Sequence, residues 1–441
     1  MKNFIDFALN RQIIKGLDYA KFKEPTLIQS KIIPIITAKK DVLGVAQTGT
    51  GKTAAYVLPI LQNITINNAK YERKSCKTLI VVPTRELAMQ VYDNVKIFSK
   101  YLSIRTSLVV GGVKPSPQLK SLLKGVDILV GTPGRMMDHV KSGGLSLKYT
   151  TTIVLDEADQ LMDLGFMPDI KKMVSHLPKH RQTIFMTATM LKEVKEIALK
   201  FLKEFKEINL APKATPIEKI KQKIILIDQG AKLDKLKKII LEEKIFQAII
   251  FARTKKRADN LAKALNKNNF NSMSFHGDKR QSQRTRILDS FKKNKLNFLI
   301  ATDVAARGID IDDIMFVINY DLPMQPEIYV HRIGRTARAG KEGTAISLLE
   351  HLEKKKLFAI EKLIGQKFII ENETNRTQET KDNRNKKTAK FNINNNQNRR
   401  KNETKINKKK KNKKFNSNDK KYLRKDKVKE GKKNLTSNNI K

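Results

Sequence analysis

A glycine-rich octapeptide, residues 46–53, carries the most distinctive chemistry in this sequence. It follows the short apolar run Val42–Val45 and leads into a helical pattern that starts near Ala54. Gly49 and Gly51 let the backbone curl so that its N–H groups face phosphate oxygens, and the following helix adds the positive end of its dipole. A lysine and a hydroxyl residue at the end of such a loop bind the terminal phosphates and Mg²⁺. The nucleotide-binding residues predicted here are Ala46, Gln47, Thr48, Gly49, Thr50, Gly51, Lys52 and Thr53.

An acid pair, Asp156 and Glu157, ends the apolar run Thr152–Leu155 about a hundred residues after this loop. A parallel strand delivers the residues that follow it to the ligand-binding edge of a sheet. We expect Asp156 to hold Mg²⁺ through water, together with the Thr53 hydroxyl, and Glu157 to polarise an attacking water molecule. An acid pair alone more often serves to place negative charge at the N-terminus of a helix, where it stabilises the helix dipole. Its pairing with a phosphate loop favours ATP hydrolysis, with Lys52 on the phosphates.

The composition of the 441-residue chain points to a polyanionic partner. Lys and Arg total 89 against 44 Asp and Glu, a formal net charge of +45. Displacing counterions from phosphates drives association of so basic a protein with nucleic acid. No apolar run approaches the length of a bilayer span, so no membrane partner is expected. Cys76 is the only cysteine, which rules out an intrachain disulfide and fits a reducing, cytoplasmic setting, where we expect a monomer.

Strand-like apolar runs alternate with amphipathic stretches through residues 1–370, which is typical of parallel sheets with crossover helices. Residues 78–85 resemble residues 248–254, and residues 127–132 match residues 297–302 at the same offset along the chain. Short apolar runs also resemble one another by chance. Two matches at one offset nevertheless predict a duplicated α/β domain.

Composition also sets the predicted domain boundaries. Residues 209–218 contain two prolines and no periodicity, and are expected to link domains at residues 1–208 and 219–370. Asn and Lys dominate beyond residue 370, and residues 372–441 carry a net charge of +18. Such a segment cannot bury enough apolar surface to offset its ordering entropy. We therefore expect residues 371–441 to form a disordered tail that tethers RNA; a solvated extension without function is the alternative.

The acid pair belongs to the tetrad Asp156-Glu157-Ala158-Asp159, and with it residues 4 to about 343 resemble a DEAD-box RNA helicase. The resemblance implies two tandem RecA-like domains, with ATP and Mg²⁺ as cofactors and RNA as partner. Residues 22–29 are similar to the Q motif of this family. That similarity implies that Gln29 binds the adenine edge and Phe22 stacks on the base, which would select ATP over GTP.

Three loops after apolar runs, at residues 83–88, 111–112 and 132–135, resemble motifs that grip RNA in the first domain of this family. They offer hydroxyls, helix-start N–H groups and arginines, which suit sugar and phosphate oxygens and carry no base information. Any one of them alone would more often be a plain strand-to-helix turn, but three in order favour RNA. The resemblance implies RNA contacts by Pro83, Thr84, Arg85, Gly112, Thr132 and Arg135.

The second half of the chain continues the resemblance. Similarity to the family's motifs implies that Arg284 and Thr302 contact the RNA backbone, and that Asp310 binds the ATP ribose. Arg335 and Arg338 resemble the arginine fingers of this family. A lone arginine pair would otherwise be read as a surface ion pair.

Two positions depart from the family pattern. Residues 187–189 are similar to a motif usually written Ser-Ala-Thr, which implies that Thr187 and Thr189 couple hydrolysis to strand separation. Thr187 keeps the hydroxyl of the usual serine and adds a methyl group. Ala337 stands where the family usually has glycine, so a positive φ at this position would be costly.

The predicted ATP residues are divided between the two halves of the sequence, and the RNA residues are divided in the same way. The complete site is therefore expected only when the cleft between the domains closes, so that ATP and RNA bind cooperatively. The resemblance adds local unwinding of a bent strand, without long-range translocation. A short basic tail is similar to bacterial DEAD-box proteins linked to ribosome assembly, RNA decay and cold adaptation.

Two other functions compete with this prediction. A DNA translocase or repair helicase of the wider superfamily would share the phosphate loop, but the Gln29 motif and the complete acidic tetrad argue against it. A non-enzymatic RNA chaperone could act through the basic tail alone. The presence of Lys52, Glu157, Arg335 and Arg338 argues against that as the whole function.

Overall fold

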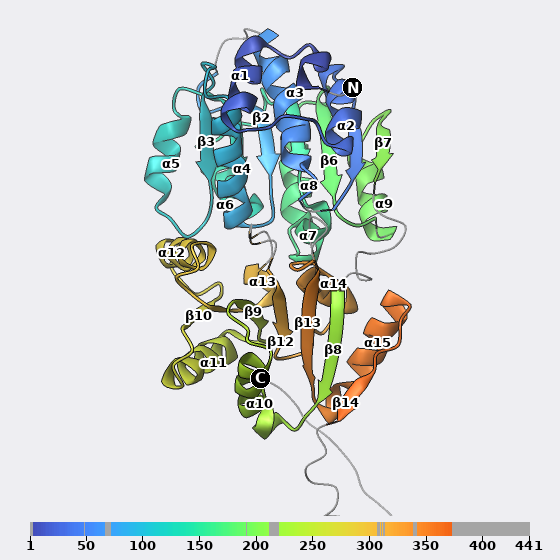
Figure 1. Cartoon of the computed structure of the whole chain (residues 1–441). Helices are drawn as coiled ribbons and strands as arrows, with labels where there is room; N and C mark the ends of the chain where they lie inside the picture. Colours follow the sequence, from blue (N-terminus) through green and yellow to red (C-terminus); the bar gives the residue numbers. More distant parts are fainter. Residues whose placement is uncertain are drawn as a thin grey trace, which may run out of the picture. The chain divides into compact units, whose positions relative to one another are not determined.

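The computed structural model contains two α/β domains of one design (Figure 1). The structure describes residues 3–47, 49–66, 72–190, 192–210, 220–306, 309, 311, 314–337 and 342–372. Most of the predicted linker and nearly all of the predicted tail lie outside these ranges. Three predicted site residues also lie outside them, namely Thr48, Asp310 and Arg338.

The first sheet has seven parallel strands in the order β3-β4-β2-β5-β6-β1-β7. Its inner strands β1 and β4 are buried along their whole length, as a sheet that is covered on both faces requires. The strands are β1 (Val42–Val45), β2 (Cys76–Val81), β3 (Thr106–Val109), β4 (Val126–Gly131), β5 (Thr152–Leu155), β6 (Gln182–Thr187) and β7 (Lys206–Asn209).

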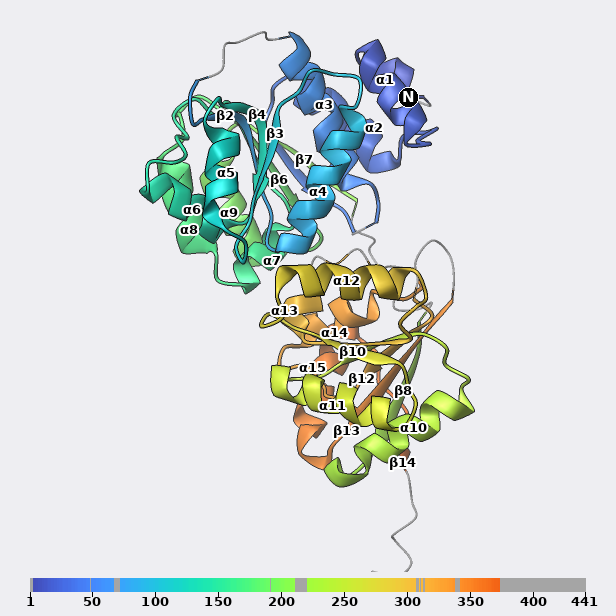
Figure 2. The same cartoon turned by 90° about the vertical axis from the view of Figure 1, so that its left-hand side faces the viewer.

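Helices cover both faces of this sheet, as Figure 2 shows. One apolar cluster joins one sheet face to α1–α4, and a second joins the opposite face to α5–α9. The 3-10 helix η1 (Phe4–Phe7) packs into the first cluster. The helices are α1 (Arg11–Tyr19), α2 (Leu27–Thr37), α3 (Lys52–Ile66), α4 (Arg85–Phe98), α5 (Pro115–Leu122), α6 (Pro133–Lys141), α7 (Ala158–Asp163), α8 (Met167–Ser175) and α9 (Lys192–Phe201).

The second sheet also has seven parallel strands, in the order β10-β11-β9-β12-β13-β8-β14. Its last strand extends two residues into the segment that the sequence assigns to the tail. The strands are β8 (Ile220–Leu226), β9 (Ala248–Phe251), β10 (Ser272–Phe275), β11 (Phe298–Ala301), β12 (Phe316–Asn319), β13 (Gly343–Leu349) and β14 (Ile370–Asn372).

Alternate residues of these strands point to opposite faces, and each face has its own core. Ile250 packs with α10 and α11, whereas its neighbours Ile249 and Phe251 pack with α12 and α13. A further cluster holds α14 and α15. The helices are η3 (Gln229–Ala231), α10 (Lys232–Glu242), α11 (Lys255–Lys267), α12 (Gln281–Lys292), α13 (Asp303–Ala306), α14 (Pro326–Ile333), η4 (His351–Glu353) and α15 (Lys354–Ile364).

The sheet orders confirm the internal repeat. The matching segments of the sequence form β2 and β9, which are both third in their sheets, and β4 and β11, which are both second. The predicted α/β fold with two tandem parallel-sheet domains is therefore confirmed. None of the helices in the described ranges has both the length and the apolar content that a bilayer crossing requires.

Candidate functional site

The order of the first sheet separates the predicted nucleotide residues from the predicted RNA residues. The phosphate loop follows β1, the acid pair follows β5 and residues 187–189 lie at the end of β6, and these strands are neighbours in the order β5-β6-β1. The predicted RNA loops follow β2, β3 and β4, which form the other half of the sheet. Carboxyl ends of parallel strands meet at one edge, where such sheets bind their ligands.

The phosphate loop has the sharply curled backbone that its glycines were predicted to allow. Gly49 and Gly51 have φ of 82° and 89°, in the region that residues with a side chain rarely adopt. Lys52 begins α3 and is buried, and its Nζ donates to the carbonyl oxygen of Ala46 at 2.7 Å. A carbonyl of the loop itself thus holds the Lys52 ammonium group, and the phosphate oxygens of a nucleotide can compete with that carbonyl for it.

Gln29 and Thr26 support the phosphate loop from α2. The Gln29 Nε2 donates to the Gly51 carbonyl at 3.1 Å, while its Oε1 accepts the Thr26 N–H at 2.9 Å. The Thr26 hydroxyl donates to the Thr50 carbonyl at 2.8 Å. A Cβ at Gly51 would lie 2.4 Å from the Gln29 amide, so glycine is required here for close approach as well as for φ. The contact of Gln29 with adenine stays a prediction.

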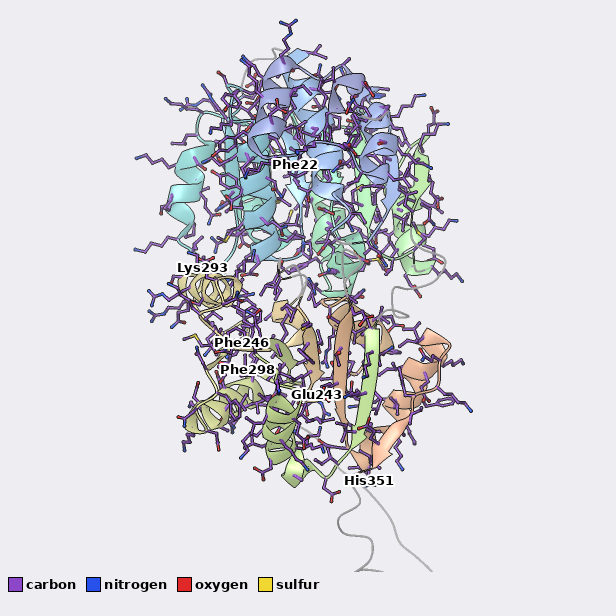
Figure 3. All side chains as sticks on the ribbon, viewed as in Figure 1. Phe22, Glu243, Phe246, Lys293, Phe298 and His351 are labelled. Carbon is purple, nitrogen blue, oxygen red and sulfur yellow. The ribbon has the colours of Figure 1, made fainter. Side chains whose placement is uncertain are left out.

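Phe22 lies at the edge of this region, where Figure 3 labels it on the first domain. Its ring stands perpendicular to that of Phe98 with 5.4 Å between the centroids, and 37% of the residue is exposed. The ring is therefore held by an aromatic contact while part of it remains accessible. Its stacking on adenine is likewise untested.

The acid pair is buried at the end of β5. Asp156 accepts the Glu157 N–H on Oδ1 and the Tyr56 hydroxyl on Oδ2, each at 2.9 Å. Burial raises the pKa of Asp156, and the nearby charge of Lys52 opposes that rise. Burial likewise raises the pKa of Glu157 to about 7, against the attraction of Lys52 and together with repulsion from Asp156. A carboxylate with a pKa near neutrality is suited to accept a proton from water.

The end of the acidic tetrad connects the acid pair to β6. Asp159 Oδ2 accepts hydrogen bonds from the Ala188 N–H at 3.2 Å, the Thr189 N–H at 3.0 Å and the Thr189 hydroxyl at 2.9 Å. The Thr187 hydroxyl donates to the Thr189 carbonyl at 2.9 Å, and Thr187 is fully buried. The extra methyl group of Thr187 is therefore accommodated without loss of the hydroxyl contact.

The residues at this edge fit a magnesium–nucleotide complex. Glu157 Oε2 is buried, and among the described residues it has no hydrogen-bond partner. Such an oxygen is costly to bury unless a ligand or water satisfies it. The part of the chain that the structure describes holds no group of three acidic, His or Cys side chains that could bind a metal. A metal held by Thr53 and Asp156 would therefore take most of its ligands from phosphates and water, as Mg²⁺ commonly does.

The predicted RNA residues of the first domain converge at the ends of β2, β3 and β4. Thr84 caps α4 by accepting the Leu87 N–H at 3.2 Å. The Arg85 side chain passes so close to Gly112 (φ 77°) that a Cβ there would lie 2.0 Å from its Nη1. Arg135 donates from Nη1 to the carbonyl of Val113 at 2.9 Å. Pro83 and Thr132 are buried at the starts of the same loops, and Thr132 precedes α6.

Two predicted RNA residues of the second domain meet at the end of β10. The Arg284 guanidinium lies 4.7 Å from the centre of the Phe275 ring. The Thr302 N–H donates to the Phe275 carbonyl at 3.3 Å. These residues follow β10 and β11, the counterparts of β3 and β4 in the first sheet. The second domain therefore also keeps its predicted RNA residues on neighbouring strands.

Arg335 is buried in the second domain, where its Nη1 donates to the Ile309 carbonyl at 2.9 Å. Arg332, on the preceding turn, is held by Asp303 at 2.8 Å, the Asn319 side chain at 2.9 Å and the Asp321 carbonyl at 2.7 Å. Arg332 therefore anchors α14, whereas its neighbour Arg335 remains the predicted arginine finger.

Several residues of this candidate site could not be predicted from the sequence. Thr26 and Tyr56 make site contacts that only the fold reveals, because a threonine before a helix and a tyrosine in an apolar helix look structural. Asp159 was quoted as part of a motif without a role of its own. Arg332 lies within a matched motif, and a single arginine gives no sign of which partners bury it.

Comparison with known proteins is consistent with this geometry. Residues 26–197 match the model of the DEAD/DEAH box helicase family, and residues 231–340 match the helicase conserved C-terminal domain. The chain is 39% identical over 379 residues to the DEAD-box ATP-dependent RNA helicase CshA of Geobacillus kaustophilus, covering 86% of this chain and 78% of that protein. It is 42% identical to the ATP-dependent RNA helicase DeaD of Buchnera aphidicola subsp. Baizongia pistaciae, covering 82% of this chain but only 59% of the relative.

Solved structures of similar proteins contain the ligands that this geometry suggests. S. cerevisiae Dbp5 bound to RNA and ADP BeF3 is 30% identical with a TM-score of 0.73, and the match covers 84% of this chain and 95% of that chain. Mss116p bound to ssRNA and AMP-PNP is 28% identical with a TM-score of 0.74, covering 85% of this chain and 79% of that chain.

Proposed function

This chain belongs to the DEAD-box family of ATP-dependent RNA helicases, and from that premise we propose that it couples RNA-stimulated ATP hydrolysis to local, non-processive separation of short RNA duplexes. One observation carries the proposal. The phosphate loop, the acid pair and the segment 187–189 follow three neighbouring strands, and hydrogen bonds between Asp159 and Thr189 connect the acidic tetrad to that segment.

In the proposed reaction, separate residues of the chain bind the phosphates and accept the proton. Lys52 leaves the Ala46 carbonyl for the terminal phosphates, and the buried Glu157 carboxylate accepts a proton from the attacking water. Thr53 and, through water, Asp156 would hold Mg²⁺, which would supply positive charge to neutralise the phosphates. Loss of the terminal phosphate removes a contact of the loop that carries Asp156. Because Asp159 is hydrogen-bonded to Thr189, a shift of this loop would also move the segment at the end of β6.

RNA-driven closure of the two domains is the second part of the proposal. Arg335, Arg338 and Asp310 belong to the second domain, whereas Lys52 and Glu157 belong to the first. An arginine supplied from another domain can raise the rate of phosphate cleavage by roughly 10³–10⁵. ATP and RNA each gain contacts from both domains on closure, so each should increase the affinity of the other.

Two substitutions test the proposal, because they interrupt the cycle at different steps. Lys52→Ala removes the phosphate contact, so we expect loss of both nucleotide binding and hydrolysis. Glu157→Gln removes the base but keeps the shape, so hydrolysis should fall by orders of magnitude while ATP and RNA stay bound together. RNA binding is measured by fluorescence anisotropy with ATP, with ADP and without nucleotide. Release of RNA from Glu157→Gln in the presence of ATP would contradict the closed state.

The nucleic acid that stimulates hydrolysis separates this function from its competitors. The proposal expects single-stranded RNA to stimulate ATPase activity far more than DNA of the same sequence. Stimulation by DNA would instead favour a translocase. A tail fragment that anneals RNA without ATP would show a chaperone activity beside the helicase, and annealing by the full chain with Lys52→Ala would show that this activity is independent of hydrolysis.

The cellular setting is the broadest part of the proposal. We place the protein in the cytoplasm as a monomer that acts on ribosomal precursors or with RNA-decay machinery, in line with the short basic tail and the bacterial relatives. Crosslinking the protein to cellular RNA and sequencing the fragments tests this setting directly. Recovery of neither ribosomal precursors nor decaying messages would contradict it.

A further inference from the structure

Tyr56 places a hydroxyl group against Asp156, a predicted ligand of the metal. It lies near the start of α3, within the apolar stretch Ala54–Leu58, and is fully buried. Its hydroxyl has a polar partner in the core, because it donates to Asp156 Oδ2 at 2.9 Å. A buried phenol needs a hydrogen-bond partner, and here that partner is the carboxylate at the end of β5.

Thr53 precedes Tyr56 on α3 by three residues, a spacing that places both side chains on one face of the helix. A tyrosine hydroxyl has a single proton. Because that proton is donated to the Asp156 carboxylate, the hydroxyl fixes the position of Asp156 Oδ2.

This hydrogen bond fixes the orientation of one predicted metal ligand, Asp156. The Asp156 carboxylate is held from two sides, since Oδ1 accepts the Glu157 N–H and Oδ2 accepts the Tyr56 hydroxyl. Mg²⁺ demands near-ideal octahedral geometry, so the orientation of its few protein ligands affects its affinity.

We propose that Tyr56 is a positioning residue for Mg²⁺, which orients the Asp156 carboxylate through its hydroxyl group. The inference rests on the proposed function, because it assumes that Asp156 holds the metal of the nucleotide complex. Partners that orient metal ligands commonly change metal affinity about 10- to 100-fold. A purely structural hydroxyl would instead affect stability alone.

The test is the magnesium dependence of nucleotide binding, measured with the fluorescent analogue mant-ADP. Tyr56→Phe removes the hydroxyl and keeps the ring. Its affinity for mant-ADP in EDTA should stay within about twofold of wild type, whereas the Mg²⁺ concentration at half-maximal enhancement should rise about tenfold. Tyr329→Phe is the matched control, because Tyr329 is equally buried and its hydroxyl donates to Gln222 Oε1 at 2.9 Å in the second domain. It should leave the magnesium midpoint unchanged.

The outcomes separate this inference from the proposed function. An unchanged magnesium midpoint in folded Tyr56→Phe would overturn the role of Tyr56 while leaving the helicase function intact. Wild-type binding of mant-ADP that does not depend on Mg²⁺ would overturn the assignment of the metal site itself.

A second pair of variants covers the case in which Tyr56→Phe does not fold. Asp156→Asn removes the buried charge, so the loss of the Tyr56 hydroxyl in this background should destabilise the fold less. In that background we expect Tyr56→Phe to cause no further shift of the magnesium midpoint, because the carboxylate that the hydroxyl orients is gone. A further rise of the midpoint when Tyr56→Phe is added to Asp156→Asn would show that Tyr56 does not act through Asp156.

Discussion

At the scale of single residues, the clearest local conflict in the second domain is at Ala337. It adopts φ of 58° between Arg335 and the segment that carries Arg338, and it is buried. A left-handed conformation costs a residue with a Cβ about 1–2 kcal/mol. A positive φ at Ala337 was expected from the sequence to be costly, and the structure shows that this φ occurs.

Ala337→Gly should therefore be neutral or stabilising, by up to about 1 kcal/mol, since relief of the strain offsets the greater freedom of glycine in the unfolded chain. Calorimetric unfolding of the full chain measures the change. Ala264→Gly is the control, because Ala264 lies within α11 and glycine should cost about 1 kcal/mol in a helix. Destabilisation by Ala337→Gly as large as that of the control would show that Ala337 makes contacts that outweigh its strain.

The sequence indicates candidate site residues most clearly where the side chain is itself reactive or charged. Lys52, Asp156 and Glu157 occupy the positions that their motifs predict, each buried near a strand end. Tyr56 and Thr26 were missed because their roles depend on partners that are distant in sequence, such as the carboxylate of Asp156. No local pattern distinguishes a tyrosine that fills a core from one whose hydroxyl orients a ligand.

At the scale of elements, the internal repeat extends to the way helices begin. Thr84 accepts the N–H of Leu87 at 3.2 Å at the start of α4, and Thr254 accepts that of Arg257 at 3.1 Å at the start of α11. These two threonines are separated by the same offset that relates the repeated apolar runs. Such helix caps are readable from sequence because they depend on neighbouring residues. The order of the strands is not, because parallel pairing joins segments far apart in the chain.

One carboxylate joins α11 to the loop that leads into α12. Asp259 Oδ1 accepts from the Ser274 hydroxyl at 2.5 Å and from Lys279 Nζ at 2.9 Å, and it lies 3.0 Å from His276 Nε2. Burial raises the pKa of Asp259, but the bonds from Ser274, His276 and Lys279 outweigh it and hold the pKa well below its usual value. This connection positions the helix that carries Arg284.

Asp259→Asn should lower the stability of the second domain by about 1 kcal/mol near pH 6, a value that allows for the partial exposure of Asp259. A carboxylate with a depressed pKa stabilises the fold above its unfolded pKa, near 4, and loses that contribution as the pH falls through its folded pKa. The difference from wild type should therefore shrink between about pH 5 and pH 2. Thermal unfolding across this range measures it.

Asp278→Asn is the matched control for this prediction. Asp278 pairs with Lys255 at 2.6 Å close to the same loop, but both side chains are largely exposed. An exposed pair contributes little, so this substitution should change stability by less than about 0.5 kcal/mol at every pH. A constant difference between Asp259→Asn and wild type from pH 6 to pH 2 would show that its carboxylate is not what connects these elements.

At the scale of the whole molecule, the two sheets divide their predicted contacts in the same way. In each sheet one half carries predicted RNA contacts, at β2, β3 and β4 in the first and at β10 and β11 in the second. In the first sheet the other half carries the predicted nucleotide residues. Sequence motifs predict the members of each set, but only the strand order shows that each domain keeps its predicted RNA residues on neighbouring strands. Each domain therefore has its own group of predicted RNA residues.

The basic tail gives a prediction that depends on charge alone. Residues 373–441 lie outside the described residues, and they carry a net charge of +18 out of +45. Truncation at residue 371 would remove part of β14, which pairs with β8. Ending the chain after Asn372 keeps that strand and removes the charge. Nucleotide binding by the shortened chain should match that of the full chain.

The shortened chain should bind single-stranded RNA more weakly at low salt, and its affinity should depend less steeply on salt. Each phosphate that the tail neutralises contributes about 0.7 to the slope of log affinity against log salt for a single strand. A loss of four tail contacts would thus flatten the slope by about 3. Fluorescence anisotropy at salt concentrations of roughly 50 to 200 mM gives both quantities.

A tail of scrambled sequence and equal charge is the control for this truncation, and it should restore the slope, because neutralisation of phosphates depends on the number of charges and not on their order. If the shortened chain keeps the slope of the full chain, the folded domains alone carry the electrostatic contact with RNA, and the tail does not tether it.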